Sequence, residues 1–308
     1  MHDILTEILG VLQLHSLVYC QSQIHRQDWA LCFTPVRGAA FHVVSQGQCR
    51  LSDGTHEVVL SAGDVLVLPY GTEHQIADRQ NATPRAVIDL DDGQEQPCRV
   101  LRWGDSPEGT TLICGIFKLE AYNTPGMLSL LPPLLYFPAG SNHSNGIATA
   151  VNTLIEEANA DRQGKLAILH RLADILFVQL IRAWLADPST EASGWLAGMR
   201  DPQLASSLSA IHAQPAHAWT VGQLASHAAM SRSAFAARFT EIIGVPPATY
   251  LVGWRMQLGA QLLSDPNLSV VQVAMRVGYA SDIAFSRAFK RLHGMSPAAY
   301  RRGVGAQG

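Results

Sequence analysis

Charged side chains are scarce in this chain of 308 residues, since Asp, Glu, Lys and Arg make up only 15 % of it. Hydrophobic residues make up 47 %, which is enough to bury a core and excludes an intrinsically disordered chain. Long uncharged apolar runs are also lacking, because the most apolar stretch, residues 168–186, is interrupted by four charged or polar side chains. We therefore expect no membrane-spanning helix and no membrane partner.

A secretory signal and a disulfide framework are missing as well. The N-terminal segment carries Asp3 and Glu7 where a signal peptide would carry positive charge, so we expect a cytoplasmic protein. Five cysteines are an odd number, and no C-x-x-C pair occurs. All five lie within the first 114 residues, at positions 20, 32, 49, 98 and 114. This spacing does not indicate a disulfide-stabilised fold.

Three patterns follow one another along the chain and predict an α+β multidomain protein. Short apolar runs bounded by turn residues, such as 41–44, 58–60 and 65–68, predict strands of a sandwich or barrel. Residues 166–184 are apolar at helical spacing, and Asp187-Pro188 ends that pattern. We expect a β-rich domain over residues 1–140, a helical connector over 141–196 and an all-α domain over 197–308.

The net charge of −3 is the average of two unlike parts. Residues 1–199 have a net charge of −9, whereas residues 200–308 carry ten Lys and Arg against four Asp and Glu, a net charge of +6. A basic segment favours contact with nucleic-acid phosphates, and an acidic one disfavours it. The C-terminal third is therefore the expected nucleic-acid-binding part.

That basic third contains an internal repeat. The segment 220–225 matches 269–274 at an offset of 49, and a set of aromatic, Gly and Pro residues then recurs at an offset of 50. The recurring set is Phe235, Phe239, Gly244, Pro247 and Tyr250 in the first copy and Phe285, Phe289, Gly294, Pro297 and Tyr300 in the second. A repeat of this length is one supersecondary unit used twice.

Each copy has the pattern helix, tight turn, helix. Thr220 and Ser269 are N-cap residues for the first helix, and Ser231 and Ser281 are N-cap residues for the second. The phenylalanines, four residues apart, anchor the second helix to a core and leave its other face exposed. This pattern predicts two helix-turn-helix units, joined by a helix over 247–263, that reach major grooves about 34 Å apart. A helical bundle with a duplicated unit is the alternative.

Residues 219–302 resemble the DNA-binding domain of AraC/XylS-type transcription regulators. The second copy carries the more specific motifs, at 277–281, 285–290 and 294–297. The resemblance implies a sequence-specific regulator that binds double-stranded promoter DNA and, as an activator, RNA polymerase. It also implies a homodimer, for which the helices over 147–186 offer an apolar face; packing of that face on the β-rich domain is the alternative.

The second recognition helix carries more charged side chains than the first. The resemblance makes Arg287 the best candidate for a base contact, because Arg pairs bidentately with guanine. Phosphate contacts are expected of Lys290, Arg291, Arg301 and Arg302, and Arg232 and Arg238 of the first helix can also contact the DNA backbone. Ala236 and Ala237 in the first helix can reach at most a thymine methyl, so base reading by that helix stays open. The candidate DNA-binding residues are Arg232, Ser233, Ala236, Arg238, Asp282, Ile283, Ser286, Arg287, Lys290 and Arg291.

The spacing Gly63-x5-Pro69-x-Gly71-x2-His74 resembles the second conserved motif of cupin barrels. The resemblance implies a cupin-like N-terminal barrel that is filled by side chains or holds a small ligand. In metal-binding cupins this motif supplies one histidine, and an earlier motif supplies two histidines and a glutamate.

The earlier cupin motif is incomplete here. His42 is present, but Val44 stands at the position of the second histidine and no glutamate follows. A metal held by His42, His74 and Cys49 is one interpretation, and two histidines hydrogen-bonded inside a barrel are the other. Because the carboxylate is missing, we expect no catalytic site and no required cofactor.

The whole chain also resembles a subgroup of these regulators that has a cupin-like N-terminal domain and includes a sensor of reactive chlorine. The supporting residues are 41–44, Cys114-Gly115, 128–133 and 170–185. The resemblance implies that Cys114 and, by a looser match, Cys20 are oxidised. Inert cysteines in the core are the alternative.

Three functions follow from these observations. The first is a DNA-binding regulator whose cupin-like domain senses a small ligand or an oxidant, and this is the function we expect. The second is a cupin-type metal-dependent enzyme with an accessory helical domain, which would need the metal ligands that the earlier motif lacks. The third is a DNA-binding protein whose barrel serves only as a dimer scaffold.

Overall fold

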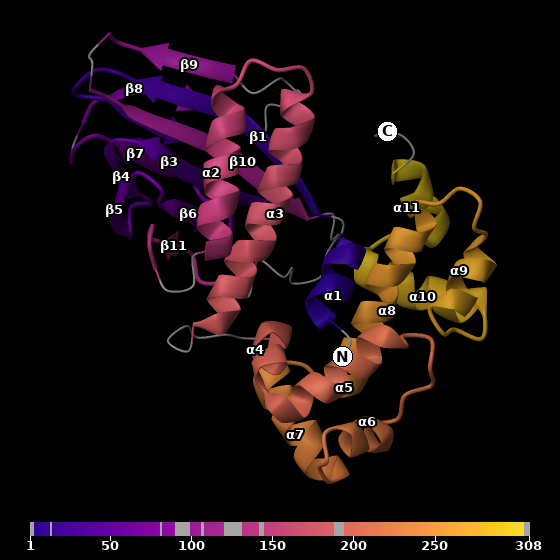
Figure 1. The fold of residues 1–308 in the computed structure, drawn as a ribbon. Helices are drawn as coiled ribbons and strands as arrows, with labels where there is room; N and C mark the ends of the chain where they lie inside the picture. Colours follow the sequence, from indigo (N-terminus) through magenta and orange to yellow (C-terminus); the bar gives the residue numbers. More distant parts are fainter. Residues whose placement is uncertain are drawn as a thin grey trace. The chain divides into compact units, whose positions relative to one another are not determined.

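The computed structural model describes residues 3–12, 14–80, 82–89, 99–105, 108–119, 131–141, 145–187 and 194–304. Within these ranges the chain forms two compact units (Figure 1). One contains all the described strands together with α2 (Asn145–Asn159) and α3 (Lys165–Ala186). The other combines α1 (Ile4–Leu12) with the helices from residue 194 onward. Cys98 and residues 128–130 lie outside the described residues.

The β-rich unit has two sheets that enclose a common core. The six-stranded sheet has the order β11 (Leu135–Phe137), β6 (Val65–Leu68), β3 (Ala39–Gln46), β10 (Thr110–Leu119), β1 (Leu14–Ile24) and β9 (Arg99–Trp103). The five-stranded sheet has the order β5 (Glu57–Ser61), β4 (Gln48–Ser52), β7 (His74–Ala77), β2 (Ala30–Phe33) and β8 (Pro84–Ile88). The strands predicted over 41–44, 58–60 and 65–68 are confirmed as β3, β5 and β6.

Both faces of the six-stranded sheet are covered, which explains why β3 and β6 read as continuous apolar runs. One face turns Ala40, His42 and Val44 toward the core between the sheets. On the other face Phe41 stacks on Phe117 with ring centroids 4.3 Å apart. Phe117 in turn packs at 4.9 Å on Phe177 of α3, the helix that lies across this sheet in Figure 1.

The other compact unit, called the helical unit below, contains only helices among its described elements. After α4 (Gly194–Arg200) and α5 (Pro202–Ala213), two short helix pairs follow, separated by one long helix (Figure 1). The first pair is α6 (Val221–His227) and α7 (Arg232–Ile243), the long helix is α8 (Pro247–Leu263), and the second pair is α9 (Val270–Arg276) and α10 (Asp282–His293), followed by α11 (Pro297–Val304). The two predicted helix-turn-helix units and the helix joining them are confirmed.

The compact units differ from the predicted division of the chain at two places. The sequence predicts residues 1–140 as one β-rich domain, but α1 buries Ile4, Leu5 and Ile8 and packs on α5 and α8 of the helical unit. The sequence predicts 141–196 as a separate connector, but α2 and α3 belong to the β-rich unit because α3 packs on β1 and β10. Both differences follow from where an apolar helix face packs, and the predicted domain boundaries stay a prediction.

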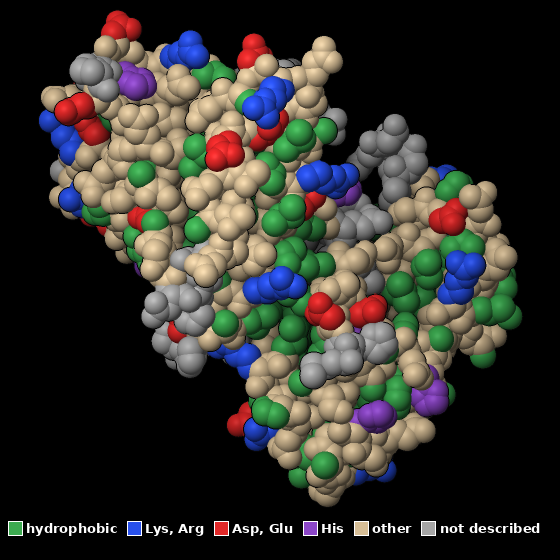
Figure 2. All heavy atoms as spheres, viewed as in Figure 1, with side chains coloured by type: hydrophobic (Ala, Val, Ile, Leu, Met, Phe, Trp, Pro, Cys, Tyr) green, Lys and Arg blue, Asp and Glu red, His purple; other side chains and the backbone are tan. Residues whose placement is uncertain are grey.

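No helix in the described part of the chain is long and apolar enough to cross a membrane. On the face shown in Figure 2, acidic and basic side chains are scattered over both units and do not gather into one patch. This agrees with the low charged fraction of 15 %.

Candidate DNA interface and sensor site

The first helices of the two helix-turn-helix units begin with the same capping arrangement. Thr220 Oγ1 accepts a hydrogen bond of 3.2 Å from the Gln223 backbone N–H, and the Gln223 side chain accepts one of 2.9 Å from the Thr220 N–H. Ser269 and Gln272 repeat both bonds at 3.2 and 2.8 Å. These capping boxes satisfy N–H groups that the helix itself leaves without acceptors.

The second helices, α7 and α10, are also matched at both ends. Ser231 and Ser281 accept hydrogen bonds of 3.3 and 3.2 Å from the backbone N–H three residues on. Gly244 and Gly294 end these helices with φ values of 85° and 76°, a conformation that favours glycine. The inward faces are anchored by fully buried Phe235, Phe239, Phe285 and Phe289. The predicted caps and core anchors of both units are therefore confirmed.

The outward face of α10 carries the predicted contact residues. Arg287, Lys290 and Arg291 are exposed, and Ile283 is 62 % exposed. Ser286, like Asp282 at the start of the helix, is half-buried. An exposed helix face with three cations suits a major groove and its flanking phosphates. These residues lie on the solvent side of one helix, and their contacts with DNA stay a prediction.

The outward face of α7 is less charged. Arg232 and Ser233 are exposed and Ala236 is half-buried, as a recognition helix with small side chains would present them. Arg238 has a structural partner, because its Nε and Nη2 donate to Asp201 Oδ2 at 2.9 and 2.6 Å. The structure therefore assigns Arg238 first to an ion pair, which competes with the predicted phosphate contact.

Asp201 connects that ion pair to the preceding helix. Its Oδ1 accepts hydrogen bonds from the backbone N–H groups of Gln203 and Leu204, which caps α5. Burial raises the pKa of Asp201, but these N–H groups and the Arg238 guanidinium more than offset that effect and leave the pKa below its usual value.

Arg301, predicted to meet a phosphate, is also engaged within the protein. Its Nε donates to the Leu263 carbonyl at 3.1 Å and its Nη2 to the Leu268 carbonyl at 2.6 Å. These bonds tie α11 to the end of α8 and the loop after it. Arg302, by contrast, is exposed and stays a candidate for a phosphate.

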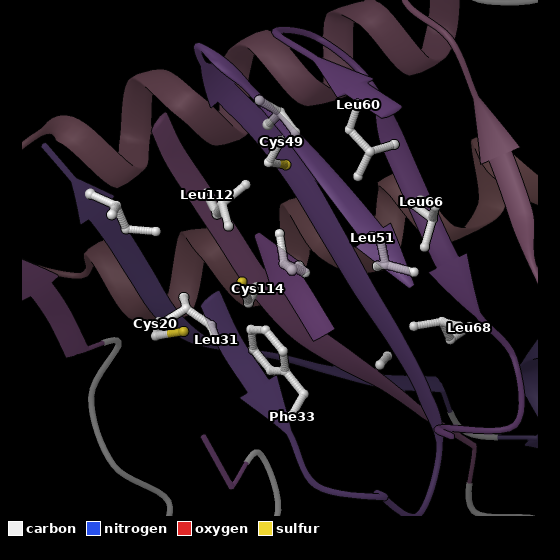
Figure 3. Close-up of a cluster of buried hydrophobic side chains, with 14 of the residues drawn as sticks. Cys20, Leu31, Phe33, Cys49, Leu51, Leu60, Leu66, Leu68, Leu112 and Cys114 are labelled. Carbon is white, nitrogen blue, oxygen red and sulfur yellow. The ribbon is translucent and has the colours of Figure 1, made fainter. Parts of the chain in front are cut away.

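In the β-rich unit, Cys20, Cys114 and His42 lie in one row across three neighbouring strands. The antiparallel register places Cys20 of β1 opposite Cys114 of β10, and Cys114 opposite His42 of β3. Their exposed fractions are 3 %, 0 % and 0 %. Figure 3 shows Cys20 and Cys114 in the same buried cluster, together with Leu31 and Phe33 of the other sheet. The sulfur of Cys114 lies 3.0 Å from His42 Nδ1.

A histidine from the second sheet continues this row. His42 Nε2 and His74 Nε2 are 2.7 Å apart, and His74 Nδ1 lies 2.8 Å from the carbonyl oxygen of Thr72. A carbonyl only accepts, so His74 Nδ1 donates and its Nε2 must accept from His42. His42 Nδ1 then accepts the Cys114 thiol proton. One backbone carbonyl thus sets the direction of the whole chain of hydrogen bonds.

Both histidines are neutral in this arrangement. Burial lowers the pKa of His74 to about 4, although the Thr72 carbonyl and Asp53 oppose that effect. Burial, followed by the charge of His74, lowers the pKa of His42 well below its usual value. Phe33 stacks on the His74 ring with centroids 4.8 Å apart, which adds to the exclusion of water.

Two glycines allow this packing. Gly71 has φ +57°, and a Cβ there would lie 2.3 Å from the Val36 carbonyl oxygen. Gly115 has no unusual φ, but a Cβ would lie 2.3 Å from the Leu17 carbonyl and 2.5 Å from the Phe41 ring. The glycine next to Cys114 is therefore explained by close approach of β1, and Gly71 by both its conformation and its neighbours.

Cys49 does not join the histidines. Its register partner is Leu60 of β5, and burial together with the charge of Asp64 raises the pKa of its thiol to about 12. The sulfur beside His42 is that of Cys114, so the ligand set of His42, His74 and Cys49 is corrected. Among the residues that the structure describes, no group of three or more His, Cys, Asp or Glu could hold a metal ion. These side chains do not fit the metal centre of a cupin.

Sequence reasoning missed the partners that act through backbone or distant contacts. The Thr72 carbonyl has no residue-type signal, because any residue supplies a carbonyl. The stacking of Phe33 on His74 depends on the pairing of β2 with β7. Asp201 could have been found from its position before Pro202, which is typical of a helix N-terminus.

Comparison with known proteins gives two family matches. A cupin family model matches residues 3–186, and a helix-turn-helix domain model matches residues 224–303. The first match includes α1 and the described β-rich unit, and the second includes the helices from within α6 to α11, whereas α4 and α5 lie outside both matches. The first match spans more than half of the chain.

Full-length relatives are found as well. An AraC-like transcription regulator of Streptomyces antibioticus is 33 % identical over 306 residues, covering 97 % of this chain and 98 % of the relative. The HTH-type transcriptional regulator AlkR of Acinetobacter baylyi is 31 % identical, covering 97 % and 99 %. The RCS-specific HTH-type transcriptional activator RclR of Escherichia coli is 31 % identical over 268 residues, covering 86 % and 84 %.

Proposed function

This chain belongs to the AraC family of transcription regulators and carries a cupin domain, and on that basis we propose how it reads DNA and what it senses. As a DNA-binding regulator it places one recognition helix, α7 or α10, in each of two successive major grooves. The observation that carries this proposal is the pair of identically capped units whose second helices are buried on one face and exposed on the other. We assign base contacts mainly to Arg287, since the outward side chains of α7 are small.

The test uses the full chain and a randomised DNA library. Repeated selection should yield a site with two conserved segments about one duplex turn apart. A gel shift on that site should resist non-specific competitor DNA and weaken as salt rises. Selection that enriches no sequence, or a shift lost to competitor, would contradict sequence-specific reading.

We further propose that the barrel senses a small two-electron oxidant. Cys20 and Cys114 are thiols on directly opposed positions of β1 and β10. Cross-strand partners in an antiparallel pair have Cβ atoms roughly 5 Å apart, so little movement is needed to join them. The row of hydrogen bonds gives the Cys114 proton an acceptor at His42. The relative named as RCS-specific supports an oxidant as the signal.

The chemistry balances with hydrogen peroxide as the oxidant. The Cys114 sulfur attacks one peroxide oxygen, giving a sulfenic acid and water. The Cys20 thiol then attacks the sulfenic sulfur, which forms the disulfide and releases a second water. Two electrons leave the two sulfurs and reduce the peroxide. Hypochlorous acid would take the same two electrons and release chloride.

Mass spectrometry of the oxidised full chain tests this step. We expect a peptide pair joined through Cys20 and Cys114 and a change in operator affinity that reductant reverses. Cys114→Ser should lose both, whereas Cys32→Ser, a half-buried cysteine on β2, is the matched control and should keep both. If oxidant changes the operator affinity equally in a variant lacking Cys20, Cys114, His42 and His74, the result would instead favour a barrel that acts only as a scaffold.

We also propose that the chain forms a homodimer through α3. Ile168 and Ile175, two turns apart on this helix, are 45 % and 50 % exposed, whereas apolar residues such as Leu169, Leu176 and Leu180 on the same helix are buried. Ile175→Glu should lower the mass measured by light scattering to that of one chain. As an activator acting in the cytoplasm, the dimer would also contact RNA polymerase.

A further inference from the structure

The long helix α8 carries the cores of both helix-turn-helix units. Tyr250 and Trp254, toward its start, pack around His212 of α5. Three residues toward its end lie in the core of the second helix-turn-helix unit: Met256, Ala260 and Leu263. One helix therefore connects two separate packing centres, and the angle between the two recognition helices depends on how firmly those centres are joined.

Arg255 lies between these two halves of α8 and binds both units. Its Nε donates to the Pro215 carbonyl at 2.7 Å and its Nη2 to the His217 carbonyl at 2.8 Å, both in the loop that precedes α6. Its Nη1 lies 3.4 Å from the carbonyl of Gly278, in the turn of the second unit. The planar guanidinium is suited to several acceptors held in a fixed geometry.

The same two segments also touch directly. Gly278 has φ +85°, and a Cβ there would lie 2.7 Å from both the Cα and the carbonyl oxygen of Ala216. The corresponding residue of the first unit is Ala229, which adopts φ 52° despite its side chain. The glycine in the second unit is thus needed because the loop of the first unit packs against it, and not only because of its backbone conformation.

We propose that Arg255, with the Ala216–Gly278 contact, is the positioning element that fixes the operator spacing this regulator accepts. The spacing meant is that between the two half-sites that α7 and α10 of one chain read. The contacts lie away from the axis of α8, so they resist bending and twisting of the helix between the two cores. Arg255 is half-buried, and its guanidinium is engaged by three carbonyls, so it acts through the recognition helices and not by touching bases. The proposal rests on DNA binding by both units.

The test measures affinity against spacing. The selected operator is compared with versions that have one or two base pairs inserted or removed between the half-sites. Each base pair rotates one half-site by about 34° relative to the other. For the unaltered full chain we expect at least about a tenfold loss for a change of one base pair. Arg255→Gln should bind the original operator about tenfold more weakly than the unaltered chain does. Its affinity should fall by less than about threefold further when the spacing is altered.

Two further variants separate positioning from general weakening. Arg232→Gln, an exposed cation on α7, should bind more weakly by the same factor at every spacing. Arg255→Lys, which keeps the charge and one carbonyl contact, should give an intermediate spacing profile. This variant replaces Arg255→Gln in the test if the glutamine variant folds poorly. A profile for Arg255→Gln parallel to that of the unaltered chain would overturn the proposal. Binding by Arg232→Gln that is unchanged on all sites would instead count against DNA contact by the first unit.

Discussion

At the scale of single residues, exposure and hydrogen bonding divide the basic side chains into two groups. Arg238, Arg255 and Arg301 belong to the helical unit, and their guanidinium groups are bound by a carboxylate or by backbone carbonyls. Arg287 and Lys290 are exposed on α10. A charge already held by the protein has less to gain from a phosphate, so the exposed group is the one expected to contribute to DNA affinity.

Arg287 and Lys290 should differ in what they read. Arg287→Ala should cost about 1–3 kcal/mol on the selected operator and relax the preference at one base position, because a bidentate guanine contact is lost. Lys290→Ala should weaken binding to all sequences about equally. Binding of both variants to operators mutated one position at a time tests this, and a uniform loss for Arg287→Ala would make it a phosphate contact.

The buried histidines should make the β-rich unit sensitive to acid. The pKa of His74 is about 4 when folded and about 6.5 when unfolded. Between these values the unfolded chain binds the proton and the folded chain does not, so stability is lost as pH falls from about 6.5 to about 4. The loss approaches about 1.4 kcal/mol per pH unit. His74→Gln should reduce this slope, measured by urea unfolding from pH 7.5 to 5.

A matched control accompanies the histidine prediction. Val87, 71 % exposed on β8 of the same unit, carries no titratable group, so Val87→Ala should leave the pH slope of stability unchanged. His212, buried in the helical unit, has a pKa of about 3, lowered by burial. It should keep part of the acid sensitivity in every variant. An equal slope with and without His74 would show that its burial does not control acid unfolding.

At the scale of elements, the helix α8 contains two glycines in opposite environments. A Cβ at Gly253 would meet nothing within 4 Å, whereas one at Gly259 would lie 2.9 Å from the ring of Phe285. Helical glycine costs about 0.5–1 kcal/mol relative to alanine when nothing else depends on it. The first glycine is thus a weakness of the helix, and the second makes room for an aromatic anchor of α10.

Alanine at these two positions should shift stability in opposite directions. Gly253→Ala should raise the free energy of unfolding by about 0.5–1 kcal/mol. Gly259→Ala should lower it by about 1–3 kcal/mol, because it overpacks the core around Phe285. Denaturation of each full-length variant, followed by the far-ultraviolet signal of the helices, measures both. Stabilisation by Gly259→Ala would mean that the Phe285 ring can move without cost.

At the scale of the whole molecule, charge is separated along the chain. The net charge of −9 over residues 1–199 belongs mostly to the β-rich unit, and the +6 over residues 200–308 belongs to the helical unit. Long-range repulsion between the acidic part and DNA should keep non-specific binding weak. Affinity should then depend on the exposed cations of the recognition helices and α11.

The salt dependence of binding measures how many cations meet phosphates. Each phosphate contact adds about −0.9 to the slope of log affinity against log salt. Arg302→Gln should make the slope shallower by about that amount, since Arg302 is exposed on α11. Arg301→Gln should leave the slope unchanged and lower stability, because Arg301 holds the Leu263 and Leu268 carbonyls. A shallower slope for Arg301→Gln would return it to the phosphate contacts.

Local patterns in the sequence were sufficient for the helix-turn-helix units. Caps such as Thr220 and Ser281 and the phenylalanine pairs act within one or two helical turns, so spacing alone indicates them. The strand runs and the Gly63 to His74 motif are likewise short-range. The incomplete earlier cupin motif drew attention to His42 and the second motif to His74, but neither indicated the contacts of His42 with Cys114 and of His74 with the Thr72 carbonyl.

What the sequence by itself determined is the kind of protein this is: a β-rich domain followed by a duplicated, basic DNA-binding domain. Only the tertiary structure decided which groups meet. The register of β1, β10 and β3 brings Cys20, Cys114 and His42 into one row. The packing of α8 against neighbouring segments brings Arg255 to carbonyls 23 to 40 residues away in the sequence. Spacing along a chain fixes neighbours within an element, whereas contacts between elements depend on how their apolar faces pack.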